Sequence, residues 1–138
     1  MNVVDSCGWL EYFANGPNAD LFEPALTDDS ALLVPAITLL EVARVLLRQR
    51  GDAAAQTALA FMARGKLADL DPAGLLRVAQ ASIQPRLAIA DALIWQTACD
   101  QGATLWTQSA GLAGLPGVRC PGAVDSTRLN RPTRAAAS

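Results

Sequence analysis

Short apolar segments alternate along this chain with longer segments of helical periodicity, and this alternation limits the possible folds more than any other feature. Residues 31–34 form a wholly apolar run that Pro35 ends, as expected for a strand buried on both faces of a sheet. Residues 36–50 then carry apolar side chains at helical spacing, and Gly51 ends that helix. Repetition of this unit predicts a single α/β domain in which helices flank a parallel sheet.

The other segments are assigned by the same signals of spacing, capping and turn residues. Ser6 is expected to cap the first helix, and Asp52 is expected to cap the helix of residues 53–64. Asp71 and Pro72 are expected to begin the helix that carries Leu75 and Val78. Residues 125–138 show no periodicity and are expected to be a disordered tail. Strands are predicted over residues 2–5, 31–34, 67–70, 104–107 and 118–119, and the remaining helices over 8–13, 17–23 and 89–101.

The composition restricts the chemistry available to a catalytic site. Histidine is absent, which excludes mechanisms that use imidazole as a base, a nucleophile or a metal ligand. The three cysteines are far apart, so neither a disulfide framework nor a close-spaced zinc pair is expected. The net charge of -2 gives no overall basic field that would attract nucleic acid. Without a secretory leader, or an apolar stretch near the roughly 20 residues that cross a bilayer, the protein is expected to be cytoplasmic.

Three carboxylates stand where an α/β sheet gathers its ligands. Asp5 ends the first predicted strand, Glu41 lies about a turn and a half into a helix, and Asp91 lies in the first turn of another. Ligands collect at the carboxyl ends of parallel strands because loops and helix amino termini meet there. Converging carboxylates repel one another unless a cation neutralises them, and their hard oxygen atoms suit Mg2+ or Mn2+. Such an ion would supply a Lewis acid and an activated water, which allows phosphodiester hydrolysis without histidine.

Each of these residues also has an interpretation without catalysis. Asp91 could satisfy backbone N–H groups at the start of its helix, and Glu41 could pair with Arg44 on the helix surface. Asp5 is harder to explain in this way, because a charge that closes a buried strand needs a partner. Arg44 and Arg48 share a stripe of the helix with Glu41, so they could hold RNA phosphates or could simply be solvated charges.

Four stretches, in this order and at this spacing, resemble the VapC branch of the PIN-domain family. They are VVDSCGWLEYF at 3–13, PAITLLEV at 35–42, LAIADALI at 87–94 and GATLWTQS at 102–109. The resemblance spans nearly the whole chain, and it implies a PIN-like domain over residues 1–124. It also implies a three-layer α/β/α sandwich around a mainly parallel, twisted sheet.

The resemblance further implies the toxin of a toxin–antitoxin pair. Such a toxin is a Mg2+- or Mn2+-dependent endoribonuclease that acts on tRNA or other structured RNA. It is often a homodimer, and it is bound by a VapB-like antitoxin whose carboxy-terminal segment wraps the toxin. By the same resemblance Asp5, Glu41 and Asp91 are the catalytic metal ligands. Ser6, Thr107 and Ser109 would form the outer shell of the metal site, and Arg44 and Arg48 would contact RNA.

The chain departs from the family pattern after the last long strand, where a fourth acid is usual and Ser109 stands instead. A serine can hydrogen-bond a metal-bound water but supplies no charge. Reduced activity is therefore expected, and an inactive PIN module that binds antitoxin or RNA is the main alternative. A phosphorylation-receiver domain also places an aspartate after a strand, but it needs a lysine near that site. Lys66, the only lysine, precedes a different predicted strand.

Overall fold

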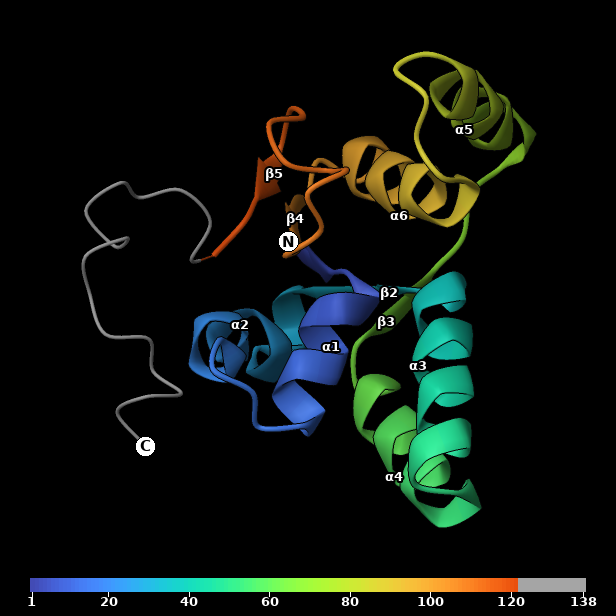
Figure 1. The fold of residues 1–138 in the computed structure, drawn as a ribbon. Helices are drawn as coiled ribbons and strands as arrows, with labels where there is room; N and C mark the ends of the chain where they lie inside the picture. Colours follow the sequence, from blue (N-terminus) through green and yellow to red (C-terminus); the bar gives the residue numbers. More distant parts are fainter. Residues whose placement is uncertain (122–138) are drawn as a thin grey trace.

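The strands of the computed structural model are short and all run parallel, in the order β3-β2-β1-β4-β5 (Figure 1). The structure describes residues 1–121. The strands span Asn2–Val4 (β1), Leu32–Pro35 (β2), Lys66–Ala68 (β3), Thr104–Trp106 (β4) and Val118–Arg119 (β5). The predicted parallel sheet is confirmed, and β1 occupies its centre.

A pair of helices connects each of β1, β2 and β3 to the next strand, whereas a loop leads directly from β4 to β5. The helices span Ser6–Phe13 (α1), Ala19–Thr27 (α2), Ala36–Gln49 (α3), Asp52–Met62 (α4), Pro72–Ile83 (α5) and Ile89–Asp100 (α6). A short 3-10 turn at Asp29–Ala31 leads into β2. Within residues 1–121, no helix is both long enough and apolar enough to cross a membrane.

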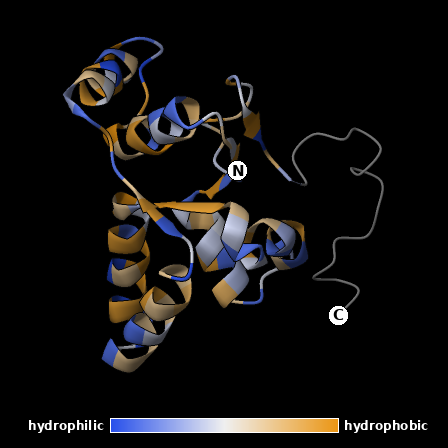
Figure 2. Cartoon of the chain, turned by 180° about the vertical axis from the view of Figure 1, so that it is seen from behind, coloured by the Kyte–Doolittle hydropathy of each residue, from blue (hydrophilic) through white to orange (hydrophobic). Residues whose placement is uncertain are grey.

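The central strand sends alternate side chains to two separate cores, which makes the fold three-layered. Val4 packs against α1, α2, α3 and α4 on one face, in the cluster that contains Trp9 and Met62. Val3 packs on the other face with Leu105 and with Ile94 of α6. Because successive residues of a strand point to opposite faces, a strand covered by helices on both sides must be apolar throughout. Figure 2 shows hydrophobic colouring along these central strands.

The α5–α6 hairpin extends the second layer outward. Val78 and Ala81 of α5 pack against Ala92 of α6. Several large apolar side chains of this hairpin stay exposed: Leu75, Leu76, Ile83 and Ile89.

Two predicted helix caps are wrong, and the reason is local hydrogen bonding. Asp5, not Ser6, caps α1, because its carboxylate accepts the backbone N–H of Ser6. Asp52 is the first residue of α4, where Gly51 at φ 87° takes the cap position. Asp71 caps α5 as predicted, since its Oδ1 accepts the backbone N–H of Gly74 at 2.8 Å. The predicted tail at 125–138 and the end of the predicted domain at residue 124 lie outside the described residues.

Candidate active site

Asp5 and Thr107 meet at the carboxyl ends of the two neighbouring strands β1 and β4. The backbone N–H of Asp5 donates to Trp106 O at 2.9 Å, which continues the β1–β4 pairing by one residue. The Thr107 hydroxyl then donates to Asp5 Oδ2 at 2.7 Å, and both residues are buried. Parallel neighbours end at the same edge of a sheet, so the strand register itself creates this contact.

Glu41 brings a second carboxylate to this edge from the first half of α3. Its Oε1 atom is buried and has no hydrogen-bond partner among the described residues. Burial raises the pKa of Glu41, and repulsion from Asp5 and Asp91 raises it further, whereas a hydrogen bond from Ser6 lowers it. A buried carboxylate oxygen without a donor is costly, and a cation would relieve that cost.

Asp91 supplies the third carboxylate from the first turn of α6. Burial and the charge of Asp5 raise its pKa. Gly111 lies close to this carboxylate. A Cβ added at Gly111 would lie 3.5 Å from Asp91 Oδ2 and 3.7 Å from Ser109 Oγ. Asp91 and Ser109 therefore flank the same small space.

The interpretations without catalysis are supported only in part, since Asp91 does lie in the first turn of α6, where its charge favours the helix dipole. The start of α6 has no side-chain cap, so Asp91 does not serve there as a capping residue. No ion pair joins Glu41 to Arg44 in the part of the chain that the structure describes. The charge of Asp5 instead raises the pKa of both Glu41 and Asp91, and the charge of Asp91 raises that of Glu41.

The donor set fits a hard divalent cation, although the side chains are not yet gathered around one point. Within residues 1–121, no three His, Cys, Asp or Glu side chains lie as close together as one ion would hold them. Three carboxylates, one of which has a buried and unpaired oxygen among the described residues, nevertheless match the ligands that Mg2+ and Mn2+ prefer.

The three predicted outer-shell residues lie beside these acids. Ser6 donates twice to Asp5 Oδ1, from its backbone N–H at 2.8 Å and from its hydroxyl at 3.4 Å, and a hydrogen bond from its side chain also lowers the pKa of Glu41. The backbone N–H of Ser109 donates to Thr107 Oγ1 at 2.9 Å. Thr107 thus holds both Asp5 and the segment that carries Ser109.

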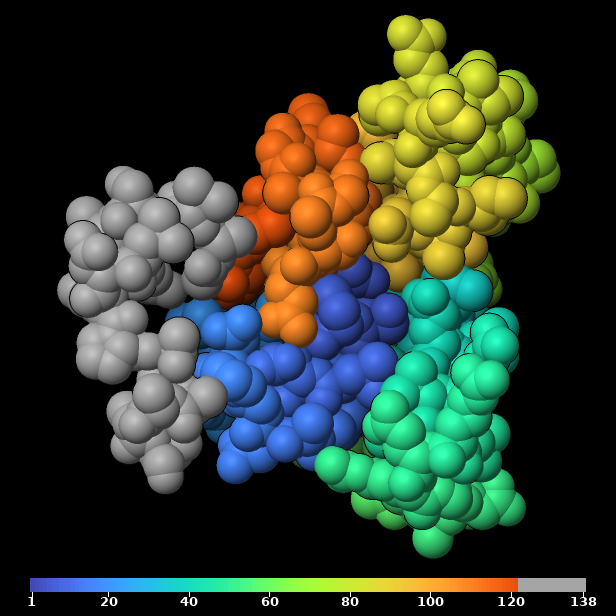
Figure 3. Space-filling model, in the orientation of Figure 1, coloured from blue at the N-terminus to red at the C-terminus, as the bar shows by residue number. Residues whose placement is uncertain are grey.

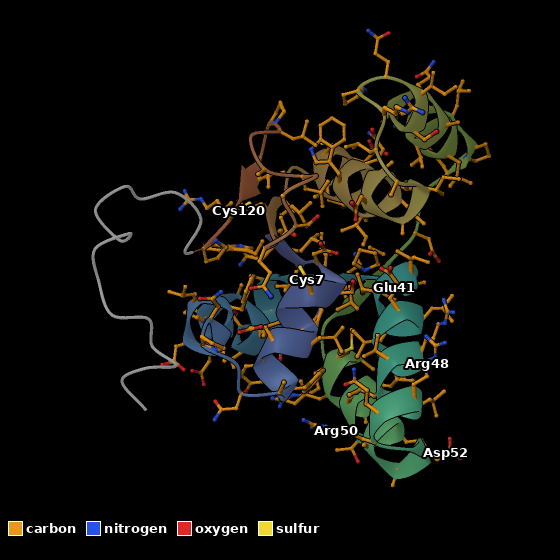
Figure 4. All side chains as sticks on the ribbon, in the orientation of Figure 1. Cys7, Glu41, Arg48, Arg50, Asp52 and Cys120 are labelled. Carbon is orange, nitrogen blue, oxygen red and sulfur yellow. The ribbon has the colours of Figure 1, made fainter. Side chains whose placement is uncertain are left out.

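Arg44 and Arg48 lie on α3 with exposed side chains. Figure 4 labels Glu41 near the start of α3 and Arg48 farther along the helix. Neither arginine forms an ion pair within the described residues. Both side chains are therefore accessible to a phosphate group, but neither forms an ion pair with a carboxylate of the candidate site.

Cys7 was not predicted to belong to the site, yet it lies inside it. Its thiol is 3.4 Å from Asp5 Oδ2 and 3.4 Å from Thr107 Oγ1, and it accepts the backbone N–H of Gln108 at 3.4 Å. Burial, followed by the charge of Asp5, raises the pKa of Cys7 to about 11, so it is a neutral thiol at pH 7. The contact with Thr107 spans 100 residues, and nothing in the spacing near residue 7 could have indicated it.

The segment after β4 is also tied to α1 and α2. Gln108 Nε2 donates to Glu11 Oε2 at 3.2 Å, and Asn18 Nδ2 donates to Gln108 Oε1 at 3.1 Å. Figure 3 shows α1, the start of α3, the start of α6 and the segment after β4 meeting on one face of the molecule. The candidate site thus collects residues from four segments that are far apart in the sequence.

Comparison with known proteins identifies the family to which this fold belongs. Residues 3–112 match the PIN domain family. No curated protein matches the chain. Solved structures with a similar fold include a toxin–antitoxin complex from Klebsiella pneumoniae, with a TM-score of 0.73, 20% identity, and coverage of 88% of this chain and 98% of that chain.

Two further structures extend the likeness. Mycobacterium tuberculosis VapC20, described as a toxin that cleaves the sarcin-ricin loop, has a TM-score of 0.65 and 13% identity, covering 82% of this chain and 92% of that chain. VapBC2 from Rickettsia felis, bound to a DNA fragment from its promoter, has a TM-score of 0.64 and 17% identity, covering 85% and 94%. The chain therefore belongs to the PIN-domain family, and its structural neighbours include VapC toxins of toxin–antitoxin systems.

Proposed function

We propose that this protein is a Mg2+- or Mn2+-dependent endoribonuclease and the toxin of a toxin–antitoxin pair, acting on tRNA or another structured RNA. The observation that carries this proposal is the approach of Asp5, Glu41 and Asp91 from three different elements, with Glu41 Oε1 buried and unpaired within the described residues. Membership of a nuclease family and the absence of histidine both favour carboxylate-based hydrolysis.

In this proposal Asp5, Glu41 and Asp91 hold the ion, which would supply Lewis acidity and an activated water for attack on a phosphodiester. Thr107 fixes the Asp5 carboxylate through its 2.7 Å hydrogen bond. Ser6 bridges Asp5 and Glu41 and thereby keeps the acids of β1 and α3 together.

Arg44 and Arg48 are proposed to bind RNA phosphates beside the site. Both are exposed on α3, and both lack an ion-pair partner in residues 1–121. Because the net charge of the chain is -2, local arginines of this kind would have to supply most of the attraction for RNA.

The proposed partners are a VapB-like antitoxin and a second copy of the chain. A cavity of about 470 Å³ opens between α1, α3 and α4, and it is mainly lined by apolar side chains. An apolar segment of the antitoxin would bury the partly exposed aromatic rings of Tyr12, Phe13 and Phe61 there. The exposed apolar residues of α5 and α6 would be covered in a homodimer. Light scattering after size-exclusion chromatography, with and without co-expressed antitoxin, tests both.

An inactive PIN module that binds antitoxin or RNA is the second candidate, and Ser109 favours it. Ser109 borders the same space as Asp91, where a fourth carboxylate would otherwise add charge for the ion. Loss of that charge weakens the attraction for a divalent cation and leaves three acids to hold it.

Titration of Mn2+ into the purified protein, followed by incubation with total tRNA, tests the proposal against this alternative. Asp5→Asn is the matched control, because it keeps the size of the side chain and removes the central charge. Metal-dependent cleavage that the control lacks would support the ribonuclease. Metal binding without cleavage would support the inactive module, and neither binding nor cleavage would refute the metal-dependent mechanism.

A further inference from the structure

Three polar residues close a ring of hydrogen bonds between α1, the start of α2 and the segment after β4. Gln108 Nε2 donates to Glu11 Oε2 at 3.2 Å, and Asn18 Nδ2 donates to Gln108 Oε1 at 3.1 Å. The backbone N–H of Asn18 completes the ring by donating to Glu11 Oε1 at 3.0 Å. Each member of this clamp, as we name the ring of Glu11, Asn18 and Gln108, is therefore bonded to both of the others.

The Glu11 carboxylate has a defined seat in the clamp. Each of its two oxygens accepts an N–H, and hydrogen bonds to a charged acceptor are stronger than those between neutral groups. Gly16 lies beside the carboxylate, and a Cβ added at Gly16 would overlap it. A larger residue at position 16 would therefore push the Glu11 side chain out of the ring. Glu11 thus serves as part of a frame and is separate from the three acids of the candidate site.

The clamp holds the middle residue of a tight turn that carries Ser109. The backbone N–H of Ser109 donates to Thr107 Oγ1 at 2.9 Å, a turn geometry that threonine hydroxyls favour. Gln108 lies between these two residues, and its own backbone N–H donates to Cys7 Sγ at 3.4 Å. Both the backbone and the side chain of Gln108 are therefore attached to α1.

Beyond the turn, Leu112 supplies a second anchor. Leu112 is fully buried, and its backbone N–H donates to Ser109 O at 3.2 Å. Ser109 thus lies between an anchor in the core and the clamp at the surface, in the position where its hydroxyl and Asp91 Oδ2 flank the same space beside Gly111. Loss of the clamp would leave Gln108 attached to α1 through its backbone N–H alone.

We propose that Gln108, held by Glu11 and Asn18, is a positioning residue that keeps the Ser109 hydroxyl beside Asp91 at the candidate metal site. The inference rests on the proposed function, because it concerns the ion that Asp91 would hold. Gln108 contacts neither the ion nor the RNA in this role and acts only through the turn that it occupies.

The variants separate the hydrogen bonds of the clamp from effects of size and net charge. Gln108→Met keeps the length of the side chain and removes both of its hydrogen bonds, and the fold should tolerate it because Gln108 is exposed. The double exchange of Glu11→Gln with Gln108→Glu also keeps the net charge, and it can rebuild all three bonds because the amide and the carboxylate trade places. Gln80→Met is the matched control, because Gln80 is an exposed glutamine on α5.

Two measurements are made on each variant. Hydrogen exchange of the Ser109 amide, followed by NMR in the metal-free protein, reports on the turn, and Mn2+ titration followed by electron paramagnetic resonance reports on the site. Gln108→Met is expected to speed exchange at Ser109 about five- to tenfold. It is also expected to weaken Mn2+ binding about three- to tenfold, at or below the effect of losing an outer-shell partner. The double exchange should restore both values, and Gln80→Met should change neither.

Each contrary outcome has a separate meaning. Unchanged exchange at Ser109 in Gln108→Met would overturn the inference, because the turn would not depend on the clamp. Faster exchange with unchanged affinity, in a protein that binds Mn2+, would overturn it too, because the clamp would then serve the fold alone. A double exchange that restores neither value would show that these hydrogen bonds are not the cause. Failure of the original protein to bind Mn2+ would overturn the proposed function and, with it, any role of the clamp at a metal site.

Discussion

Replacement of Thr107 by valine tests the hydrogen bond on which the candidate site is built. Valine has nearly the same shape, so the substitution leaves no cavity, but it removes the 2.7 Å bond to the Asp5 carboxylate. A hydrogen bond to a charged group contributes about 1.5–3 kcal/mol to stability. The Ser109 N–H also loses its acceptor, although Ser109 is only half-buried and water can replace that bond at a cost of about 0.5–1 kcal/mol.

The free energy of unfolding of Thr107→Val at pH 7 is therefore expected to fall by about 2–4 kcal/mol. Thr107→Ser is the matched control: it keeps the hydroxyl and loses one buried methyl group, at a cost of about 1 kcal/mol. Urea denaturation followed by tryptophan fluorescence measures both values. If valine costs no more than serine, the hydrogen bond is not what stabilises this end of the sheet, and the reasoning fails.

Three other measurements probe the same region. The pKa values of Glu41 and Asp91 are raised in the folded metal-free protein, so these two groups bind protons more tightly there than in the unfolded chain. The melting temperature should therefore fall as the pH rises above 4.5, the ordinary pKa of Glu41. A flat profile for the original protein, or an unchanged slope in Glu41→Gln, would contradict this. Ser109→Asp should tighten Mn2+ binding roughly tenfold in a calorimetric titration, and unchanged affinity would refute the account of the missing acid. Gly8→Ala should lower the free energy of unfolding by about 1–3 kcal/mol, because the new Cβ would lie 2.7 Å from Val4 Cγ1; a neutral result in urea denaturation would show that the helix can shift.

The sequence was sufficient to predict the layers of the fold, because each layer has a local signature. The apolar run at 31–34 and the helical spacing after it predict a strand and a helix without knowledge of any partner. The strand predicted at 67–70 spans Lys66–Ala68 in the structure. It ends at Ala68, because Asp71 begins the next helix as its cap.

The three carboxylates of the candidate site could be proposed from their positions in the sequence, but the hydrogen bonds that hold Asp5 could not. Asp5 stands at a strand end whatever the strand order, whereas its bond to Thr107 exists only because β4 pairs with β1. Strand order is a long-range property that periodicity does not encode. For the same reason Cys7 gave no signal in the sequence, and Ser6 was assigned the capping role that Asp5 performs.

The central position of β1 also bears on how the chain folds during synthesis. β1 is made first, but one of its two neighbours, β4, is made about a hundred residues later, and the Asp5–Thr107 bond spans 102 residues. Contacts between such distant parts of a chain slow folding, because a long loop must close before they form. A growing chain that has not yet released β4 from the ribosome would carry Asp5 and Glu41 without Thr107 to fix them. The site would therefore assemble only when translation of the domain is nearly complete.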